Sequence, residues 1–344
     1  MDKKIGVVIL NYNGKKHLET FLPKVIACSE GAEIVVADNA STDDSLAYLK
    51  TFGDAIKTIV LDKNYGFSDG YNQALKCYCA DYYVLLNSDI EVTEGWLKPM
   101  LFALENDATI AACQPKILAY KDKAKFEHAG AAGGWMDILA YPFCRGRVFY
   151  ETEKDFGQYD EEAEIFWASG AAMFIRANLF HGIGGFDPDY FAHMEEIDLC
   201  WRLKRAGFKI KAVPSSVVYH VGGGTLDYLS TFKSYLNFRN SMMTIFKNES
   251  VLKLLWFMPL RLILDGIAGG MYLLKGEFRF IPTIIRAHFA FYGSIFKTIR
   301  KRKLYTQNIE NQRIAPFNKT AIYKGSVVFD YFLKKKKTFK ELVD

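Results

Sequence analysis

Two side chains with metal-binding chemistry follow a strongly apolar run in the first half of the chain. Residues 82–86 are all aromatic or aliphatic, and Asn87, Ser88 and Asp89 come directly after them. Such a run predicts a strand buried on both faces, and a carboxylate at its end is costly to bury without a partner. Asn87 and Asp89 are two residues apart, so they share one side of the pleat. Their oxygens suit Mg²⁺ or Mn²⁺, while a simple turn is the alternative interpretation.

A second group of carboxylates lies near the start of a predicted helix. Glu195, Glu196 and Asp198 belong to an amphipathic stretch that runs from residue 193 to residue 207. Three like charges within four residues repel one another, and the helix dipole offsets only part of that cost. A carboxylate whose neighbours raise its pKa is a candidate general base. The alternative is an acidic first turn on a solvated helix.

The elements that must position these groups alternate between strand and helix. The predicted strands cover residues 5–10, 33–37, 58–61 and 82–86, and the predicted helices cover residues 15–27, 71–79 and 96–105. This alternation is typical of βαβ units and predicts an α/β fold with a doubly wound, mostly parallel sheet. The polar loops at its expected edge are residues 11–13, 38–44, 64–70 and 87–89. Polar loops that converge on one sheet edge indicate a nucleotide site.

Several classes of protein are disfavoured by what the sequence lacks. It contains neither G-x-G-x-x-G nor G-x-x-x-x-G-K-[ST], which argues against dinucleotide dehydrogenases and P-loop enzymes. The six cysteines form no paired C-x-x-C zinc pattern. The first residues lead directly into a strand, so no signal peptide is expected, and reduced thiols indicate the cytoplasm.

Four short stretches together resemble glycosyltransferase family 2. They are VVILNYNG at residues 7–14, VVADNASTDDS at 35–45, NYGFSDGYNQA at 64–74 and LLNSD at 85–89. The stretch EEIDLCWR at residues 195–202 is also similar to that family's E-D-x-D-L-C-x-R pattern. The resemblance implies the GT-A fold, a nucleotide-sugar-binding, doubly wound mixed sheet, here followed by a C-terminal helical segment. A rhamnosyltransferase-like bacterial member is implied because such members commonly have Asn where the metal motif D-x-D begins, as Asn87 does.

The resemblance also implies a donor site. In the family, the residue that matches Asp38 hydrogen-bonds the nucleotide base. Gly66 either meets a requirement for positive φ or lets the backbone approach the diphosphate, and Gly170 matches a patch of small residues under the donor sugar. The full set of expected donor-binding residues is Asn11, Asn13, Asp38, Gly66, Asn87 and Gly170.

The catalytic and metal residues are implied in the same way. Glu196 matches the catalytic aspartate of the family, with a side chain longer by one methylene group, and Glu195 is expected to orient the loop or the acceptor. Asp198 completes the expected catalytic set. Asp89 and His220 are the expected ligands of Mg²⁺ or Mn²⁺, although a lone His after an apolar run is often structural.

The C-terminal part combines apolar runs with positive charge. Residues 251–303 carry ten Lys or Arg and two acids, a net charge of +8 within a chain of net charge +5. The apolar runs are long enough to span a membrane, but Arg261 and Asp265 in the first make spanning unfavourable. Helices that dock on the anionic inner leaflet are the prediction; a helix pair packed on the catalytic domain or in a homodimer interface is the alternative. Nucleic acid is not an expected partner.

The sequence therefore predicts three parts: a GT-A catalytic domain at residues 3–235, a membrane-docking helical segment at 236–310 and a basic tail at 311–344. The implied reaction moves a sugar, with inversion, from a nucleotide-sugar to a hydroxyl of a glycan or polyprenyl-diphosphate-linked acceptor in cell-surface polysaccharide synthesis. The expected location is the cytoplasmic face of the cell membrane. Two alternatives remain: a sugar nucleotidyltransferase, and a nucleotide-sugar-binding membrane module that has lost catalysis.

Overall fold

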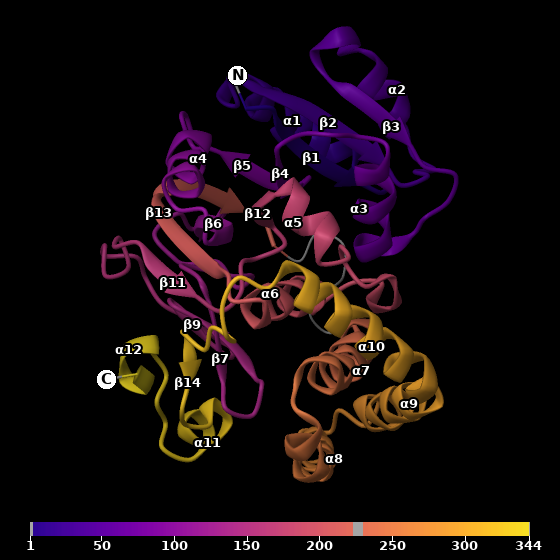
Figure 1. Ribbon diagram of the computed structural model, residues 1–344, viewed down its shortest axis with the longest axis vertical. Helices are drawn as coiled ribbons and strands as arrows, with labels where there is room; N and C mark the ends of the chain where they lie inside the picture. The colour runs from indigo at the N-terminus through magenta and orange to yellow at the C-terminus, as the bar shows by residue number, and fades with distance from the viewer. Residues whose placement is uncertain (1–2, 223–229, 344) are drawn as a thin grey trace.

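The computed structural model describes residues 3–222 and 230–343 (Figure 1). Among these residues a nine-stranded sheet has the order β11-β13-β6-β12-β4-β1-β2-β3, with β5 paired to β13. Its strands are β1 Ile5–Asn11, β2 Ala32–Asp38, β3 Lys57–Val60, β4 Tyr82–Asn87, β5 Ile90–Val92, β6 Ile110–Ala119, β11 Ala163–Ile165, β12 Ala172–Arg176 and β13 Lys209–His220. β1 is parallel to β2 and β4, whereas β12 is antiparallel to β4 and β6. The predicted mixed α/β sheet is confirmed.

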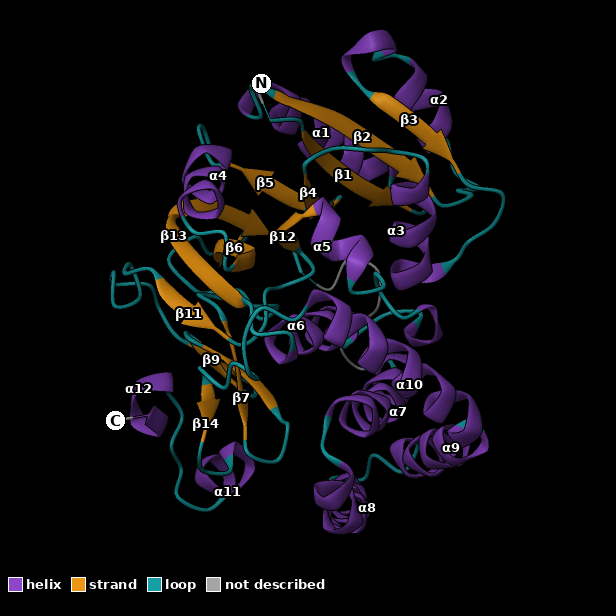
Figure 2. Cartoon of the chain, in the orientation of Figure 1, coloured by secondary structure: helices purple, strands orange, loops and turns teal. Residues whose placement is uncertain are grey.

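Helices cover both faces of this sheet because its central strands are apolar on both sides (Figure 2). One core lies under α1 Lys15–Cys28, α2 Ser45–Lys50 and α4 Leu97–Asn106. The other lies under α3 Gly66–Lys76, α5 Ala177–Gly182 and α6 Glu195–Arg205. This arrangement places the carboxyl ends of β1, β2 and β4 at one edge, as expected for parallel neighbours.

Residues 126–158, whose sequence shows no periodic pattern, contain part of a second sheet. Among the described residues its five strands have the order β10-β9-β8-β7-β14. They are β7 Gly134–Asp137, β8 Pro142–Cys144, β9 Arg147–Val148, β10 Glu151–Thr152 and β14 Ile322–Tyr323. The strands have only two to four residues each, too few for a periodic pattern to show in the sequence.

Residues 311–343, the described part of the expected basic tail 311–344, fold back onto this second sheet. β14 pairs in parallel with β7, and α11 Val327–Phe332 and α12 Phe339–Val343 follow it. Phe339 and Leu342 are buried, and the Phe339 ring packs against Trp135 with 5.1 Å between centroids. This part of the chain therefore belongs to the packed body of the protein.

The remaining helices form an array beside α6. They are α7 Thr231–Asn248, α8 Val251–Leu274, α9 Phe280–Gly293 and α10 Ile295–Gln312. α7 contacts α6, α8, α9 and α10, and the boundary expected after residue 235 falls inside α7. Arg261 and Asp265 of α8 are buried, with Arg261 Nε 2.8 Å from Asp265 Oδ1 and His288 Nε2 3.0 Å from Asp265 Oδ2. Within the described ranges, no helix combines the length and apolar character needed to cross a membrane.

Candidate active site

Side-chain hydrogen bonds join the ends of β1 and β2 at the carboxyl edge of the sheet. Asn11 and Asp38 are paired at the last position of each strand. Asn11 Nδ2 donates to Asp38 Oδ1 at 3.1 Å, and the backbone N–H of Ser41 donates to Asp38 Oδ2 at 2.9 Å. Because Asp38 is fully buried, these bonds stabilise its carboxylate and fix the loop after β2. Asn11 Oδ1 is buried without a partner among the described residues, so a polar atom remains for a ligand.

Asn13 and Gly66 both have positive φ, of 51° and 72°. Asn13 is exposed, and its Oδ1 accepts a hydrogen bond from the backbone N–H of Thr42 at 2.7 Å, which fixes the loop after β2. Gly66 meets the requirement for positive φ, and a Cβ added there would lie 2.8 Å from the carbonyl oxygen of Phe191. The close backbone approach at Gly66 is therefore made by the loop that precedes α6.

Asn39 and Asn64 also shape this edge, although they are not among the residues expected from the sequence. Asn39 Nδ2 donates to the carbonyl oxygen of Gly66 at 2.9 Å and to Asn64 Oδ1 at 3.1 Å. Asn39 Oδ1 accepts from the backbone N–H of Tyr65 at 2.9 Å. The sequence does contain a signal for this role, because an Asn side chain at the start of a loop readily hydrogen-bonds nearby backbone groups.

Asp89, His220 and Glu127 form a buried charged row beside the end of β4. His220 Nε2 lies 3.2 Å from Asp89 Oδ1, and His220 Nδ1 lies 3.1 Å from Glu127 Oε2. Burial lowers the pKa of His220, but the two carboxylates outweigh burial and raise it to about 10. Burial raises the pKa of Asp89 and of Glu127, yet contact with His220 leaves both lowered. Asn87 stands at the end of β4, where its backbone N–H donates to the carbonyl oxygen of Ala171.

The donor types in this row fit a divalent cation that is shared with a substrate. Across the described ranges, no group of three or more His, Cys, Asp or Glu side chains is arranged to hold a metal ion. Mg²⁺, however, commonly takes only one or two protein ligands and completes its shell with substrate phosphates and water. Asp89 would supply one, and His220 could supply a second only after losing the proton that its raised pKa retains, because a ligating imidazole must be neutral. The proximity of Glu127 has no signal in the sequence, because this residue lies in a segment without a periodic pattern.

Glu195 and Glu196 open α6, and each has a buried carboxylate oxygen, Oε2, with no hydrogen-bond partner among the described residues. Burial raises the pKa of Glu196 to about 7. Burial, together with the charges of Glu196 and Asp198, raises the pKa of Glu195. Gly170 lies beside Glu196, because a Cβ added at Gly170 would be 3.7 Å from Glu196 Cβ. A carboxylate in this state can accept a proton from a reacting hydroxyl.

A family comparison decides the class of this protein. The family model described as Glycosyl transferase family 2 matches residues 6–177, which is half of the 344 residues. The chain belongs to glycosyl transferase family 2. It is a glycosyltransferase, and the matched region contains the strand ends and Asp89.

Named relatives agree with this assignment. N-acetylglucosaminyl-diphospho-decaprenol L-rhamnosyltransferase of Mycobacterium tuberculosis is 25% identical over 236 residues, 64% of this chain and 76% of the relative. Rhamnosyltransferase WbbL of Escherichia coli is 24% identical over 225 residues, 63% of this chain and 83% of the relative. Within family 2, the chain is therefore a rhamnosyltransferase-like member.

Solved structures show the same fold. A crystal structure of GalNAc-T7 with UDP, GalNAc and Mn²⁺ has a TM-score of 0.54 at 19% identity and covers 71% of this chain and 47% of that one. The mannosyltransferase PcManGT from Pyrobaculum calidifontis, in complex with GDP-Man and Mn²⁺, has a TM-score of 0.50 at 14% identity. The match covers 98% of this chain and 89% of that one. The GT-A fold expected from the resemblance is confirmed.

In this family 2 enzyme, α7 holds the loop that leads to the candidate base. Phe191, His193 and Met194 have positive φ of 64°, 70° and 73°, a conformation that is strained for residues other than glycine. Asn240 Nδ2 donates to the carbonyl oxygens of Tyr190, Ala192 and His193 at 3.0, 2.9 and 2.8 Å. These bonds compensate the strain, and Arg239 Nη2 adds donations to the carbonyl oxygens of Asp189 and Tyr190 at 2.8 and 3.0 Å.

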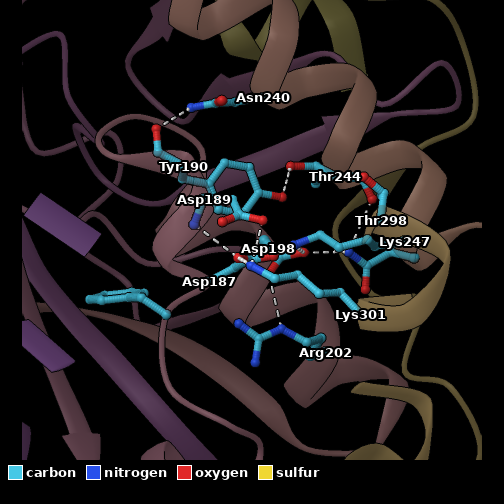
Figure 3. Close-up of polar contacts among 12 residues, drawn as sticks. Asp187, Asp189, Tyr190, Asp198, Arg202, Asn240, Thr244, Lys247, Thr298 and Lys301 are labelled. Carbon is cyan, nitrogen blue, oxygen red and sulfur yellow. Dashed lines mark hydrogen bonds and ion pairs between the residues drawn. The ribbon is translucent and has the colours of Figure 1, made fainter. Parts of the chain in front are cut away.

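Asp198 belongs to a buried ion network between α6 and α7 (Figure 3). Its Oδ2 accepts from Arg202 Nε at 3.0 Å, and its Oδ1 lies 3.2 Å from Lys247 Nζ. Lys247 Nζ also lies 2.6 Å from Asp187 Oδ2. On a helix, two residues apart means about 200° of rotation, so Glu196 and Asp198 lie on opposite faces of α6. The structure brings Glu195, Glu196 and Gly170 together and places Asp198 in the packing between α6 and α7.

Proposed function

We propose that this glycosyltransferase transfers a sugar, with inversion, from a nucleotide-sugar to a hydroxyl of a glycan or polyprenyl-diphosphate-linked acceptor in cell-surface polysaccharide synthesis. The observation that carries the proposal is Glu196, a carboxylate with raised pKa and a free buried oxygen beside Gly170. The names of the mycobacterial and Escherichia coli relatives support rhamnose as the sugar and a diphosphate-linked lipid as the acceptor.

In the proposed reaction, the loops at the ends of β1, β2 and β4 hold the nucleotide, with Asn11, Asp38 and Asn87 at their starts. Glu196 takes the proton from the acceptor hydroxyl as that oxygen attacks the anomeric carbon. One base and no covalent intermediate produce inversion. Asp89 and His220 would hold Mg²⁺ or Mn²⁺, which supplies charge stabilisation for the departing diphosphate. Glu195 orients the loop or the acceptor.

A panel of nucleotide-sugars tests the donor assignment. We expect one donor, with dTDP-rhamnose as the first candidate, to raise the melting temperature in the presence of Mn²⁺, since a ligand that binds only the folded state stabilises it. A chelator should abolish most of this shift, and Asp89→Asn should reduce the affinity for Mn²⁺ itself, measured by calorimetry. Asp54→Asn, at an exposed site away from the strand ends, is the control. Transfer at the full rate in the chelator would contradict the metal assignment.

We further propose that α8, α9 and α10 dock this enzyme on an anionic membrane surface. Large apolar side chains on these helices are exposed, among them Leu255, Trp256, Phe289 and Phe296. Basic residues accompany them, and the resulting combination is typical of interfacial helices. Buried pairing of Arg261 with Asp265 removes the two central charges from α8's outer surface.

Vesicle sedimentation tests this surface. Trp256→Ser combined with Phe289→Ser should release the protein from vesicles that contain phosphatidylglycerol, because the loss of two membrane-inserted aromatic side chains removes about 3–6 kcal/mol of apolar transfer energy. The control is Phe102→Ser with Phe156→Ser, two exposed aromatic residues outside this array. Truncating the chain near residue 245 is unsuitable as a test, because it also removes Lys247, which pairs with the buried Asp187 and Asp198. If the wild-type protein ignores such vesicles, the apolar face is instead a contact between proteins.

A further inference from the structure

A basic cluster lies next to the proposed reaction site and has no role in it so far. It consists of His128, Arg147, His193 and Lys233. Arg147 Nη1 lies 2.7 Å from His128 Nε2. Burial, the charge of Arg147 and the charge of Lys233 lower the pKa of His128 to about 2. Burial and the charge of Lys233 lower the pKa of His193 to about 4. Both rings are therefore neutral at pH 7, and the fixed positive charge comes from Arg147 and Lys233.

This cluster contains buried polar atoms that a ligand would satisfy. Arg147 Nε and His193 Nε2 are buried and have no hydrogen-bond partner within the described residues. Among residues 3–222 and 230–343, the Arg147 guanidinium contacts His128 Nε2, the carbonyl oxygen of Phe149 at 3.4 Å and Cys144 Sγ at 3.9 Å, none of them a carboxylate. A buried guanidinium N–H without an acceptor is costly, and a phosphoryl group, which Arg binds through paired hydrogen bonds, would remove that cost.

The cluster adjoins both halves of the reaction site. His128 follows Glu127, which contacts His220, and precedes Ala129, whose carbonyl oxygen accepts from Ser169 Oγ. Ser169 is next to Gly170, which lies against Glu196. His193 lies two residues before Glu195, and the Lys233 charge acts on both His193 and His128. The cluster therefore lies near the candidate base, whereas the nucleotide-binding loops are at the ends of β1 and β2.

The surroundings of Lys233 indicate which substrate would bring the phosphoryl group. The Phe232 ring is exposed and lies 5.9 Å from Phe191 and 6.3 Å from Tyr235, between centroids. Arg286 of α9 lies over the Tyr235 ring at 4.8 Å. These contacts run from α7 to α9, where Phe289 is exposed, and a lipid chain attached to a diphosphate would follow them toward a membrane.

We propose that Arg147 and Lys233, with His128 and His193, form a binding site for the diphosphate of a lipid-linked acceptor. The site deepens the proposed function and rests on it for the identity of the acceptor. The donor also carries a diphosphate, so the shared chemistry is phosphoryl recognition, and the experiment separates the two sources.

The test is calorimetry with inorganic pyrophosphate and with farnesyl diphosphate, both in a chelator so that no metal bridges the ligand to Asp89. We expect Arg147→Gln and Lys233→Met each to weaken both ligands at least tenfold. Arg300→Gln and Lys98→Met, at exposed positions elsewhere, should change binding less than twofold. Arg147→Lys, which keeps the charge, should retain part of the affinity and guards against a folding defect in Arg147→Gln. Unchanged pyrophosphate binding in Arg147→Gln and Lys233→Met would overturn the site.

The second arm uses the nucleoside diphosphate of the donor that stabilises the wild type in the panel above, with Mn²⁺. Its affinity should stay within twofold in Arg147→Gln and Lys233→Met. If it falls together with pyrophosphate binding, the cluster serves the donor diphosphate and the acceptor assignment is wrong. If no nucleotide-sugar stabilises the wild type, the proposed function fails, and the pyrophosphate arm still decides whether the cluster binds phosphoryl groups.

Discussion

Glu196→Gln is expected to lower the rate of sugar transfer by about 10²–10⁴, the usual contribution of a general base. The amide keeps the size of the side chain, so donor binding should remain near the wild-type value. A single-turnover assay, combined with calorimetry for the donor, separates the two effects. Glu196→Asp should retain part of the activity, because the resemblance places a shorter acid at this position. Glu195→Gln, on the preceding residue, is the comparison, because it removes the carboxylate expected to orient the loop or the acceptor and leaves the candidate base in place.

The pH dependence gives an independent readout. Burial raises the pKa of Glu196 to about 7, and a base acts only in its deprotonated form. The ratio kcat/KM of the wild-type enzyme should therefore rise with pH through about 7 and level off above it. In Glu196→Gln this rise should disappear. If Glu196→Gln transfers at the wild-type rate while Glu195→Gln does not, the base is Glu195.

Lys247→Met is expected to lower the free energy of unfolding by about 3 kcal/mol, because removal of one partner leaves buried carboxylates without full compensation. Lys247, Asp187 and Asp198 are all buried, with Lys247 Nζ 2.6 Å from Asp187 Oδ2 and 3.2 Å from Asp198 Oδ1. Lys301 and Arg202 still contact the two carboxylates, which keeps the loss at the lower end of the range. Urea unfolding measures the change.

Lys297→Met is the control, since Lys297 Nζ pairs with Asp189 Oδ1 at 2.6 Å but its side chain is 61% exposed. A pair of that kind contributes at most about 1 kcal/mol. An equal loss in the two variants would contradict the special role of Lys247.

The same network predicts a dependence on pH. Burial raises the pKa of Asp187, but the charges of Lys247 and Lys301 outweigh burial and hold it well below its usual value. A carboxylate with a lowered pKa in the folded state stabilises the fold fully when the pH is above the unfolded pKa of about 3.9. This stabilisation is lost as the pH falls below that value. In Lys247→Met the pKa of Asp187 rises, so a proton removes the buried charge at milder acid. The stability difference between the wild type and Lys247→Met should therefore narrow as the pH falls below about 3.9.

The sequence by itself determined the main sheet and the edge at which the chemistry lies. Strands such as 82–86 are recognisable because burial on both faces requires an unbroken apolar run, which is a local property. Since parallel strands end at one edge, the loops after β1, β2 and β4 were bound to meet there. The catalytic set expected from the sequence included both Glu196 and Asp198, although the helical period alone places residues two apart on opposite faces.

Only the tertiary structure decided which groups touch across long distances in the chain. Glu127 reaches His220, Asn240 holds the carbonyl oxygens of residues 190–193, and β14 pairs with β7. No local pattern encodes these contacts, because each depends on how separate elements pack. Arg261 and Asp265 are four residues apart on one helix, so their pairing is local. Only the fold buries this pair and brings His288 to Asp265. The free-energy cost of a charged side chain depends on its burial. Burial is set by how the whole chain packs, not by the residues next to that side chain in sequence.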